Sequence, residues 1–509
     1  MHYLAKLVPS QAVILALMIG ATSLQFPRSS AAQVATWQTH AHDPQHSAVS
    51  SVASQTLGKI HWRVPVDLAP PPGEIFIHYG SPLVTAANTV IVPVKTGANG
   101  FRVDAHDGAT GKELWSRATG YQAPSDLFIP GLGPTLFGAR LFIPDSAGGV
   151  LVRTNPDSLT GTFNHLYFYG QTNYQADPQI YQRNVQINTP LTTDSKGNLF
   201  FGFLALGSTP IGLQSGVARI APDGSGTWVS AAAISGDSTM TNVAMSCAPA
   251  LSNDGRILYV AVTNENIGNG YLVALDSRTL AVLNHVLLLD PASGEDATLI
   301  DESSAAPTVG PDGDVYFGVL ENPFPNHNDR GWMLHFNSDL SQLKIPGSFG
   351  WDDTASIVDA SLVSSYQGKS GYLLMTKYNN YAGINTGDGH NRIAILDPNA
   401  TENDPVLPGT KVMKEVITKL GVTPDPDFQN FPGAVKEWCI NSAAVDPSTK
   451  SVIANSEDGK LYRWDLTTNR LSERITLSGG IDEAYTPTLI GSDGTVYAIN
   501  DAILSAVGK

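Results

Sequence analysis

The chain has 509 residues, of which 48 are glycine and 33 are proline, and only 15% are charged. This composition favours many short strands joined by tight turns over long helices. The formal net charge of −16 disfavours nucleic acids and anionic membrane surfaces as partners and mildly favours cations or basic ligands.

The first 32 residues have the pattern of a secretory signal peptide. Lys6 precedes an apolar run at residues 11–22, and Ser30-Ala31-Ala32 supplies a small-residue cleavage site. The run is too short for a typical membrane-spanning helix, and no later stretch is longer. We therefore predict export to the periplasm or the cell exterior, with no transmembrane segment in the mature chain. Removal of residues 1–32 leaves 46 acidic against 28 basic residues, a formal charge of −18.

One structural unit recurs along residues 33–509. It contains a small or proline residue before a first strand, an Asp-Gly type turn, an aromatic strand, a third strand ending near Asp, and another turn. Such turns supply the positive φ that hairpins require, and the flanking β-branched and aromatic residues suit half-buried strands. First strands are expected to begin near Ser81, Pro134, Pro190, Ala248, Ala306, Ser361, Ser442 and Pro487. Eight units of four antiparallel strands predict a single-domain, all-β, eight-bladed propeller.

The last unit ends soon after its third strand, so its outer strand must come from elsewhere. Residues 57–66 (LGKIHWRVPV) resemble residues 111–120 (GKELWSRATG), the fourth strand of the first unit. We expect the N-terminal strand to complete the last blade, which closes the ring and protects its edges.

Residues 105–115 (AHDGATGKELW) resemble the tryptophan-docking repeat of the pyrroloquinoline-quinone, or quinoprotein-like, propeller superfamily. The matching residues are Ala105, Asp107, Thr110, Gly111, Lys112 and Trp115, and the resemblance implies a structural role for them. Residues 37–50 are also similar to the segment that precedes the first strands in that superfamily. In many alcohol-oxidising members, the family implies a quinone beside Ca²⁺, an Asp base and a disulfide between adjacent cysteines. This sequence has no adjacent cysteines.

The connection entering each first strand and the connection between the second and third strands lie on one face of a propeller. Here those connections are long and rich in acids, and loops on a rigid scaffold commonly carry binding sites. We therefore predict a ligand face around the central channel. Its candidate residues are Asp301, Glu302, Asp359, Glu437, Trp438, Asn441, Asp482, Glu483 and Tyr485. The opposite face has mostly short turns, which suit a structural role.

The residues of the ligand face are compatible with three interpretations. Convergent carboxylates with Asn oxygens could bind Ca²⁺, or they could supply an acid/base pair for catalysis. In the third interpretation they are solvated surface acids that bind no ligand. Trp438 is a candidate floor for a flat ligand. Cys247 and Cys439 precede first strands three blades apart, so buried thiols are favoured over a disulfide. His40, His42 and His46 fall in the ordinary opening segment, so metal binding there is disfavoured.

Two functions are the main hypotheses, and another propeller enzyme, such as a carbohydrate-active one that uses two carboxylates, is a third class that the sequence leaves open. The first is a non-catalytic binding or scaffold protein that uses the acidic face for an unknown protein or small-molecule ligand. The second is a dehydrogenase that oxidises alcohols or sugars with pyrroloquinoline quinone and Ca²⁺. No residue of the sequence matches the family's metal or base motifs closely enough to be assigned a catalytic or metal-binding role. The first function is therefore favoured.

Overall fold

The computed structural model describes residues 37–72, 77–124, 129–130, 132–264, 267–300, 305–480 and 487–509. The predicted signal peptide lies outside these residues. Within them, no helix combines the length and apolar character needed to span a bilayer.

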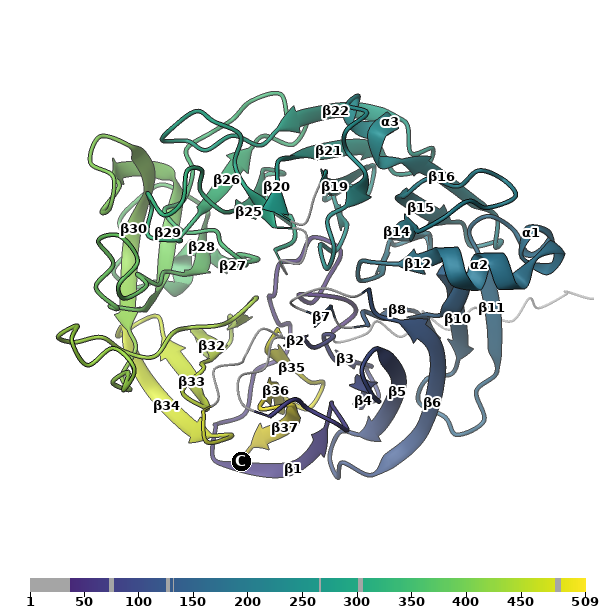
Figure 1. Ribbon diagram of the computed structural model, residues 1–509. Coiled ribbons are helices and arrows are strands. Elements are labelled where there is room, and N and C mark those ends of the chain that lie inside the picture. Colours follow the sequence, from purple (N-terminus) through teal and green to yellow (C-terminus); the bar gives the residue numbers. More distant parts are fainter. Residues whose placement is uncertain are drawn as a thin grey trace, which may run out of the picture.

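Eight sheets stand around a central channel like the blades of a propeller (Figure 1), so the predicted fold is confirmed. The first blade has β3 (Leu83–Val84), β4 (Thr89–Lys95), β5 (Gly100–Asp107) and β6 (Glu113–Gln122). The second has β8 (Thr135–Phe137), β9 (Arg140–Pro144), β10 (Gly149–Thr154) and β11 (Phe163–Tyr167). The third has β12 (Val185–Ile187), β13 (Thr192–Thr193), β14 (Leu199–Ala205), β15 (Gly216–Ile220) and β16 (Gly226–Ser230). The fourth has β17 (Asn242–Val243), β18 (Ala250–Leu251), β19 (Ile257–Thr263), β21 (Gly270–Asp276) and β22 (Val282–Leu287).

The remaining four blades complete the circle. The fifth has β24 (Thr308–Val309), β25 (Val315–Val319) and β26 (Trp332–Phe336). The sixth has β27 (Ser356–Asp359), β28 (Tyr372–Lys377), β29 (Arg392–Asn403) and β30 (Lys411–Leu420). The seventh has β31 (Ala444–Asp446), β32 (Ser451–Asn455), β33 (Lys460–Asp465) and β34 (Arg470–Thr476). The eighth joins β35 (Leu489–Ile490), β36 (Val496–Asn500) and β37 (Ile503–Gly508) to β1 (Lys59–Pro65).

Several short strands and helices lie outside the eight blade sheets. They are the two-stranded sheets β2 (Ile77–His78) with β7 (Ile129–Pro130) and β20 (Ile267–Gly268) with β23 (Leu299–Ile300), the helices α1 (Gln171–Ala176), α2 (Pro178–Asn184) and α3 (Ala231–Ser235), and the 3-10 turns at Ser146–Gly148 and Ala360–Leu362.

Burial follows from the position of a strand within its blade. The second strands β4 and β28 are buried along their whole length, because both of their faces pack against neighbouring blades. The outer strands β1 and β34 alternate between exposed and partly buried residues. Continuous apolar runs in the sequence therefore mark the strands between blades, and alternating runs mark the rim.

Three details differ from the sequence prediction. In the third and fourth blades two short strands, β12 with β13 and β17 with β18, take the place of a single first strand and pair with the same second strand. The fifth blade has three regular strands, and its outer edge is irregular: Leu343 and Gly347 pair with β26 only through isolated bridges. The first strand of the sixth blade begins at Ser356, five residues before the predicted Ser361. Residues 360–362 form a 3-10 turn in which Asp359 Oδ1 accepts a hydrogen bond from the backbone N–H of Ser361 at 2.8 Å.

Residues 37–50, which we call the channel segment, run across the centre of the ring (purple in Figure 1). Its backbone carbonyls accept hydrogen bonds of 2.8–2.9 Å from inner residues of five blades. The donor N–H groups belong to Leu136, Leu251, Val309, Ile357 and Val445. These strands would otherwise present open inner edges to the channel, so the segment satisfies backbone groups that packing alone would leave unpaired.

The residues of the docking repeat hold neighbouring blades together. Asp107 Oδ1 accepts hydrogen bonds from Thr110 N and Oγ1 at 2.9 and 2.7 Å and so forms the turn after β5. Ala105 is fully buried beside Trp115, whose indole N–H donates to the carbonyl of Pro156 in the second blade at 2.6 Å. In the same way, Trp62 of the eighth blade donates to Gly108 at 2.9 Å.

Gly111 is required where Trp62 docks. Its φ is +72°, and a Cβ there would lie 2.6 Å from Trp62 Cγ. We expect Gly111→Val to lower the free energy of unfolding by about 2 kcal/mol or more, because strain and a clash act together. Gly97→Val is the matched control in the same blade, since a Cβ at Gly97 meets no atom within 4 Å. Urea denaturation checks the pair, and equal loss in both variants would contradict this role for Gly111.

Candidate functional site

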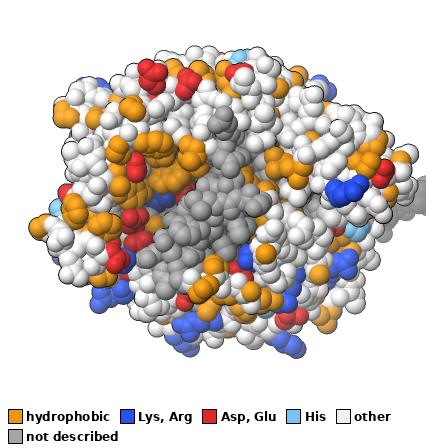
Figure 2. Space-filling view, viewed as in Figure 1, with side chains coloured by type: hydrophobic (Ala, Val, Ile, Leu, Met, Phe, Trp, Pro, Cys, Tyr) orange, Lys and Arg blue, Asp and Glu red, His pale blue; other side chains and the backbone are white. Residues whose placement is uncertain are grey.

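The predicted ligand face is described in part. Glu437, Trp438 and Asn441 belong to the segment between β30 and β31, which enters the first strand of the seventh blade. Asp301, Glu302, Asp482, Glu483 and Tyr485 lie outside the described residues. On the face shown in Figure 2, hydrophobic side chains gather left of the centre, over the region of β25 to β28, and acidic side chains lie just below them.

Glu437 meets two residues that the sequence prediction did not place in the site. The backbone N–H of Glu437 donates to Glu457 Oε1 at 2.6 Å, and the Cys439 thiol donates to Glu437 Oε2 and Glu457 Oε2 at 3.7 and 3.5 Å. One potential metal-ligating atom from each residue lies within 4.8 Å of the other two. We call Glu437, Cys439 and Glu457 the rim cluster.

The rim cluster is short of positive charge. Burial and the neighbouring Glu457 raise the pKa of Glu437 well above its usual range, whereas Lys377 acts in the opposite direction. Lys377 ends β28 and is itself buried, with its ammonium 3.9 Å from Asp352 Oδ2. Burial also raises the pKa of Asp353, and its Oδ2 has no hydrogen-bond partner among the described residues. Burial therefore favours the protonated forms of Glu437 and Asp353 unless a cation pairs with them.

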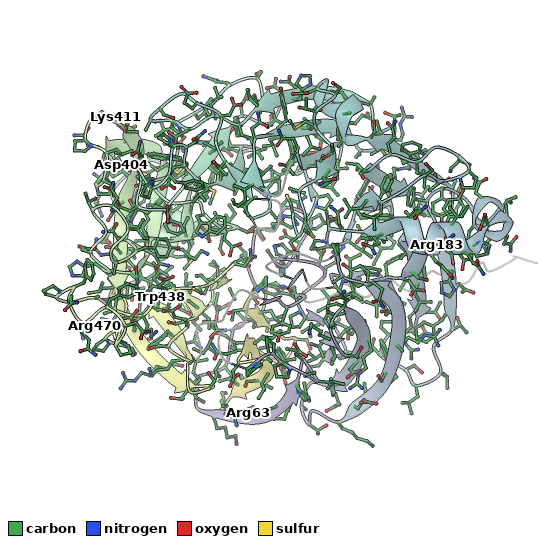
Figure 3. The ribbon with its side chains drawn as sticks, in the orientation of Figure 1. Arg63, Arg183, Asp404, Lys411, Trp438 and Arg470 are labelled. Atoms are coloured by element: carbon green, nitrogen blue, oxygen red, sulfur yellow. The ribbon has the colours of Figure 1, made fainter. Side chains whose placement is uncertain are left out.

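Trp438 does not form the floor of a flat site. It is 1% exposed, and its ring meets that of Tyr462 at 5.4 Å and an angle of 63°. Figure 3 places it where the sixth and seventh blades meet, and it belongs to the hydrophobic core between them. Trp438 thus packs into the core although both of its chain neighbours, Glu437 and Cys439, belong to the rim cluster.

Asn441 and Asp359 also differ from the expectation of a converging face. Asn441 is fully buried, and it connects two entry segments through a hydrogen bond from its Nδ2 to Thr354 Oγ1 at 3.4 Å. Asp359 ends the first strand of the sixth blade, so it belongs to the opposite face of the ring and is removed from the ligand-face candidates. The five-residue error in the start of that blade caused the misplacement.

Glu457 was not among the predicted site residues, because the sequence around it looks like a structural turn. It lies in the sequence SEDGK (456–460), and most Asp-Gly turns of this chain, such as Asp254-Gly255 and Asp312-Gly313, lie on the opposite face. Here the turn connects β32 to β33, which puts Glu457 on the ligand face. Both cysteines are buried and neither forms a disulfide, as the spacing of their blades predicts.

A second polar network lies in the fifth and sixth blades, beside a cavity of about 290 Å³. His327 is fully buried, and its Nε2 lies 3.0 Å from Asp404 Oδ2 and 3.3 Å from Ser348 Oγ. Ser348 donates to the same Asp404 oxygen. A hydrolytic relay needs the carboxylate on one imidazole nitrogen and the hydroxyl on the other, so this arrangement is a structural network. Asp404 lies at the outer edge of the ring in Figure 3.

Comparison with known proteins identifies the fold. No protein-family model matches the chain, and no curated protein matches it in sequence. Among solved structures, the quinohemoprotein alcohol dehydrogenase from Comamonas testosteroni is similar, with 13% identity and a TM-score of 0.51 over 94% of this chain and 78% of that chain. A europium-containing methanol dehydrogenase is similar with 11% identity and a TM-score of 0.54, over 91% and 89% of the two chains. The chain therefore shares the quinoprotein-like propeller fold.

The quinone that this fold family implies is not matched by the described residues. The two cysteines are far apart in the sequence and unbonded, and the rim tryptophan presents no open ring face. Pyrroloquinoline quinone is a polyanion, whereas Glu437 lies beside Glu457 and is also acted on by the charge of Asp425. The donor set around Glu437 suits a cation instead.

Proposed function

We propose that this chain is an exported, non-catalytic binding protein that captures a cationic ligand at the rim cluster of its propeller. The observation that carries the proposal is the rim cluster itself, in which a thiol lies 3.5 and 3.7 Å from two carboxylate oxygens. Ligand bonds of about 2.3 Å for sulfur and about 2.0–2.2 Å for oxygen place neighbouring tetrahedral ligands at about this separation. A divalent cation that accepts mixed sulfur and oxygen ligands fits best.

Charge supports the same assignment. A bound cation would neutralise the carboxyl groups that burial otherwise forces to hold protons, and Asp353 adds an oxygen without a hydrogen-bond partner among the described residues nearby. Because Glu437 must release its proton to bind the ion, affinity should rise as the pH rises. The overall acidity of the chain attracts cations to this face. Export rests on the sequence of residues 1–32.

Titration of the chain beginning at residue 33 with Co²⁺ tests the proposal. We expect one saturable site with the near-ultraviolet charge-transfer absorption of a thiolate–cobalt bond, and competition by Zn²⁺. Cys439→Ser should abolish the absorption and weaken binding about tenfold or more, and Glu457→Gln should weaken it similarly. Cys247→Ser is the matched control, because Cys247 is the other buried cysteine outside a disulfide. No saturable site, or an absorption that survives Cys439→Ser, would overturn the proposal.

Quinone binding and dye reduction distinguish the dehydrogenase alternative from the proposed binding function. The same protein is mixed with pyrroloquinoline quinone, with and without Ca²⁺, and assayed for tryptophan fluorescence and for alcohol- or sugar-dependent dye reduction. We expect neither quenching nor turnover at micromolar quinone. Calcium-dependent turnover would replace the binding function by a catalytic one.

A further inference from the structure

A cavity of about 730 Å³ opens on the face opposite the rim cluster. Its floor contains Val49 of the channel segment with Val309 and Ile357 of two first strands, and Tyr372 forms part of its wall. Its edge is made by turns between first and second strands, including Asn253, Pro311 and Pro447. The volume lies in the range of small-ligand sites, although the sequence alone assigns this face to structural turns.

The polar groups at the edge carry both signs of charge. Asp359 Oδ1 accepts hydrogen bonds from Ser361, and Asp312 Oδ1 accepts one from the Tyr372 hydroxyl at 2.8 Å. The second oxygen of each carboxylate has no hydrogen-bond partner among the described residues. The Lys369 ammonium likewise has no hydrogen bond or ion pair within the described part of the chain. Asp43 differs, because its two oxygens accept bonds from His42, Gln45 and Ser47 and are fully used.

We propose that this cavity is a second binding site, independent of the rim cluster, which takes a short peptide with an apolar side chain and free ends. The peptide's α-ammonium group pairs with Asp312 and Asp359, its carboxylate pairs with Lys369, and its apolar side chain covers Val309 and Ile357. Complementary charges at an exposed edge fix orientation and specificity, and the apolar floor supplies most of the affinity.

Calorimetric titration with the tripeptide Ala-Leu-Ala, its N-acetyl form and its C-terminal amide tests the site. We expect the free tripeptide to bind with 1:1 stoichiometry, and each cap to weaken binding about tenfold. Lys369→Met should remove the preference for the free carboxylate but keep the preference for the free ammonium group. Asp312→Asn combined with Asp359→Asn should do the reverse. Lys59→Met is the matched control, because Lys59 is exposed on the outer strand β1.

Each result decides the proposal. Equal binding of free and capped peptides, an unchanged preference in the variants, or no saturable binding would overturn it. These variants are expected to fold, because the three charged residues are exposed. The two sites are also separable: Cys439→Ser should leave peptide binding unchanged, and Lys369→Met should leave the cobalt absorption unchanged.

Discussion

Replacing Arg463 with methionine is expected to lower the free energy of unfolding by about 3 kcal/mol or more. Arg463 is 5% exposed and joins the start of the N-terminal strand to the seventh blade. Its Nη1 donates to Ser54 Oγ at 2.8 Å and to Ser451 Oγ at 2.9 Å, and its Nη2 donates to the Gln55 carbonyl at 2.6 Å. The buried carboxylate of Asp446 lies 3.9 Å from Nη1.

The loss is large because removal of the guanidinium takes a donor from the Gln55 carbonyl and the cation from Glu473 and Asp446. Arg470→Met is the control, since Arg470 is exposed on the outer strand β34 and lies away from the centre in Figure 3. Urea denaturation should show a large change in midpoint for Arg463→Met and a change within about 0.5 kcal/mol for Arg470→Met. Proteolysis should cleave first near residues 50–66 in the weakened variant. A small loss at Arg463 would mean that β1 is held by its pairing with β37 alone.

The architecture could be predicted because each of its local signals points to the same fold. Glycines in Asp-Gly turns, such as Gly255 at φ +67° and Gly313 at φ +91°, are where hairpins require them. Trp115 and its repeat contact the neighbouring blade, as the resemblance implies. The fifth blade was harder to predict, because its irregular edge from 343 to 347 has no alternating pattern. The channel segment was recognised only as the segment that precedes the first strands, since the hydrogen bonds that its backbone carbonyls accept leave no signal in the sequence.

The site was less predictable than the fold. Sequence topology correctly assigns Glu437 to an entry segment, but the partners of Glu437 depend on which loops meet in three dimensions. Glu457 comes from a turn that looks structural, and Lys377 ends a buried strand where an apolar residue is expected. Trp438 shows the reverse error, because aromatic character does not tell whether a side chain faces the channel or the core. Side-chain direction, rather than residue type, separates the candidates.

Lowering the pH is expected to cause the second large loss of folding stability. His40 and His46 of the channel segment are buried, with ring centroids 5.3 Å apart. Burial lowers the pKa of His40 to about 3 and that of His46 to about 4, from an ordinary value of 6.5. The Nε2 atom of each ring has no hydrogen-bond partner among the described residues, so a proton added there would stay unpaired. His46 Nδ1 lies 2.7 Å from the carbonyl of Pro307, which ties this titration to the fifth blade.

Because both pKa values are lower in the folded state, protons favour the unfolded chain. The stabilisation by each neutral histidine is complete above pH 6.5 and declines as the pH falls towards the folded-state pKa, by about 2 kcal/mol for each residue between pH 7.5 and pH 5. We expect His40→Leu to reduce the loss of stability over this interval by about 2 kcal/mol. Glu437 titrates in the opposite sense, but its contribution cancels when wild type and variant are compared. His285→Leu, at an exposed position of β22, is the control and should leave the slope unchanged. If the free energy of unfolding fell equally with pH in wild type and His40→Leu, protonation of the carboxyl groups alone would account for the loss of stability in acid.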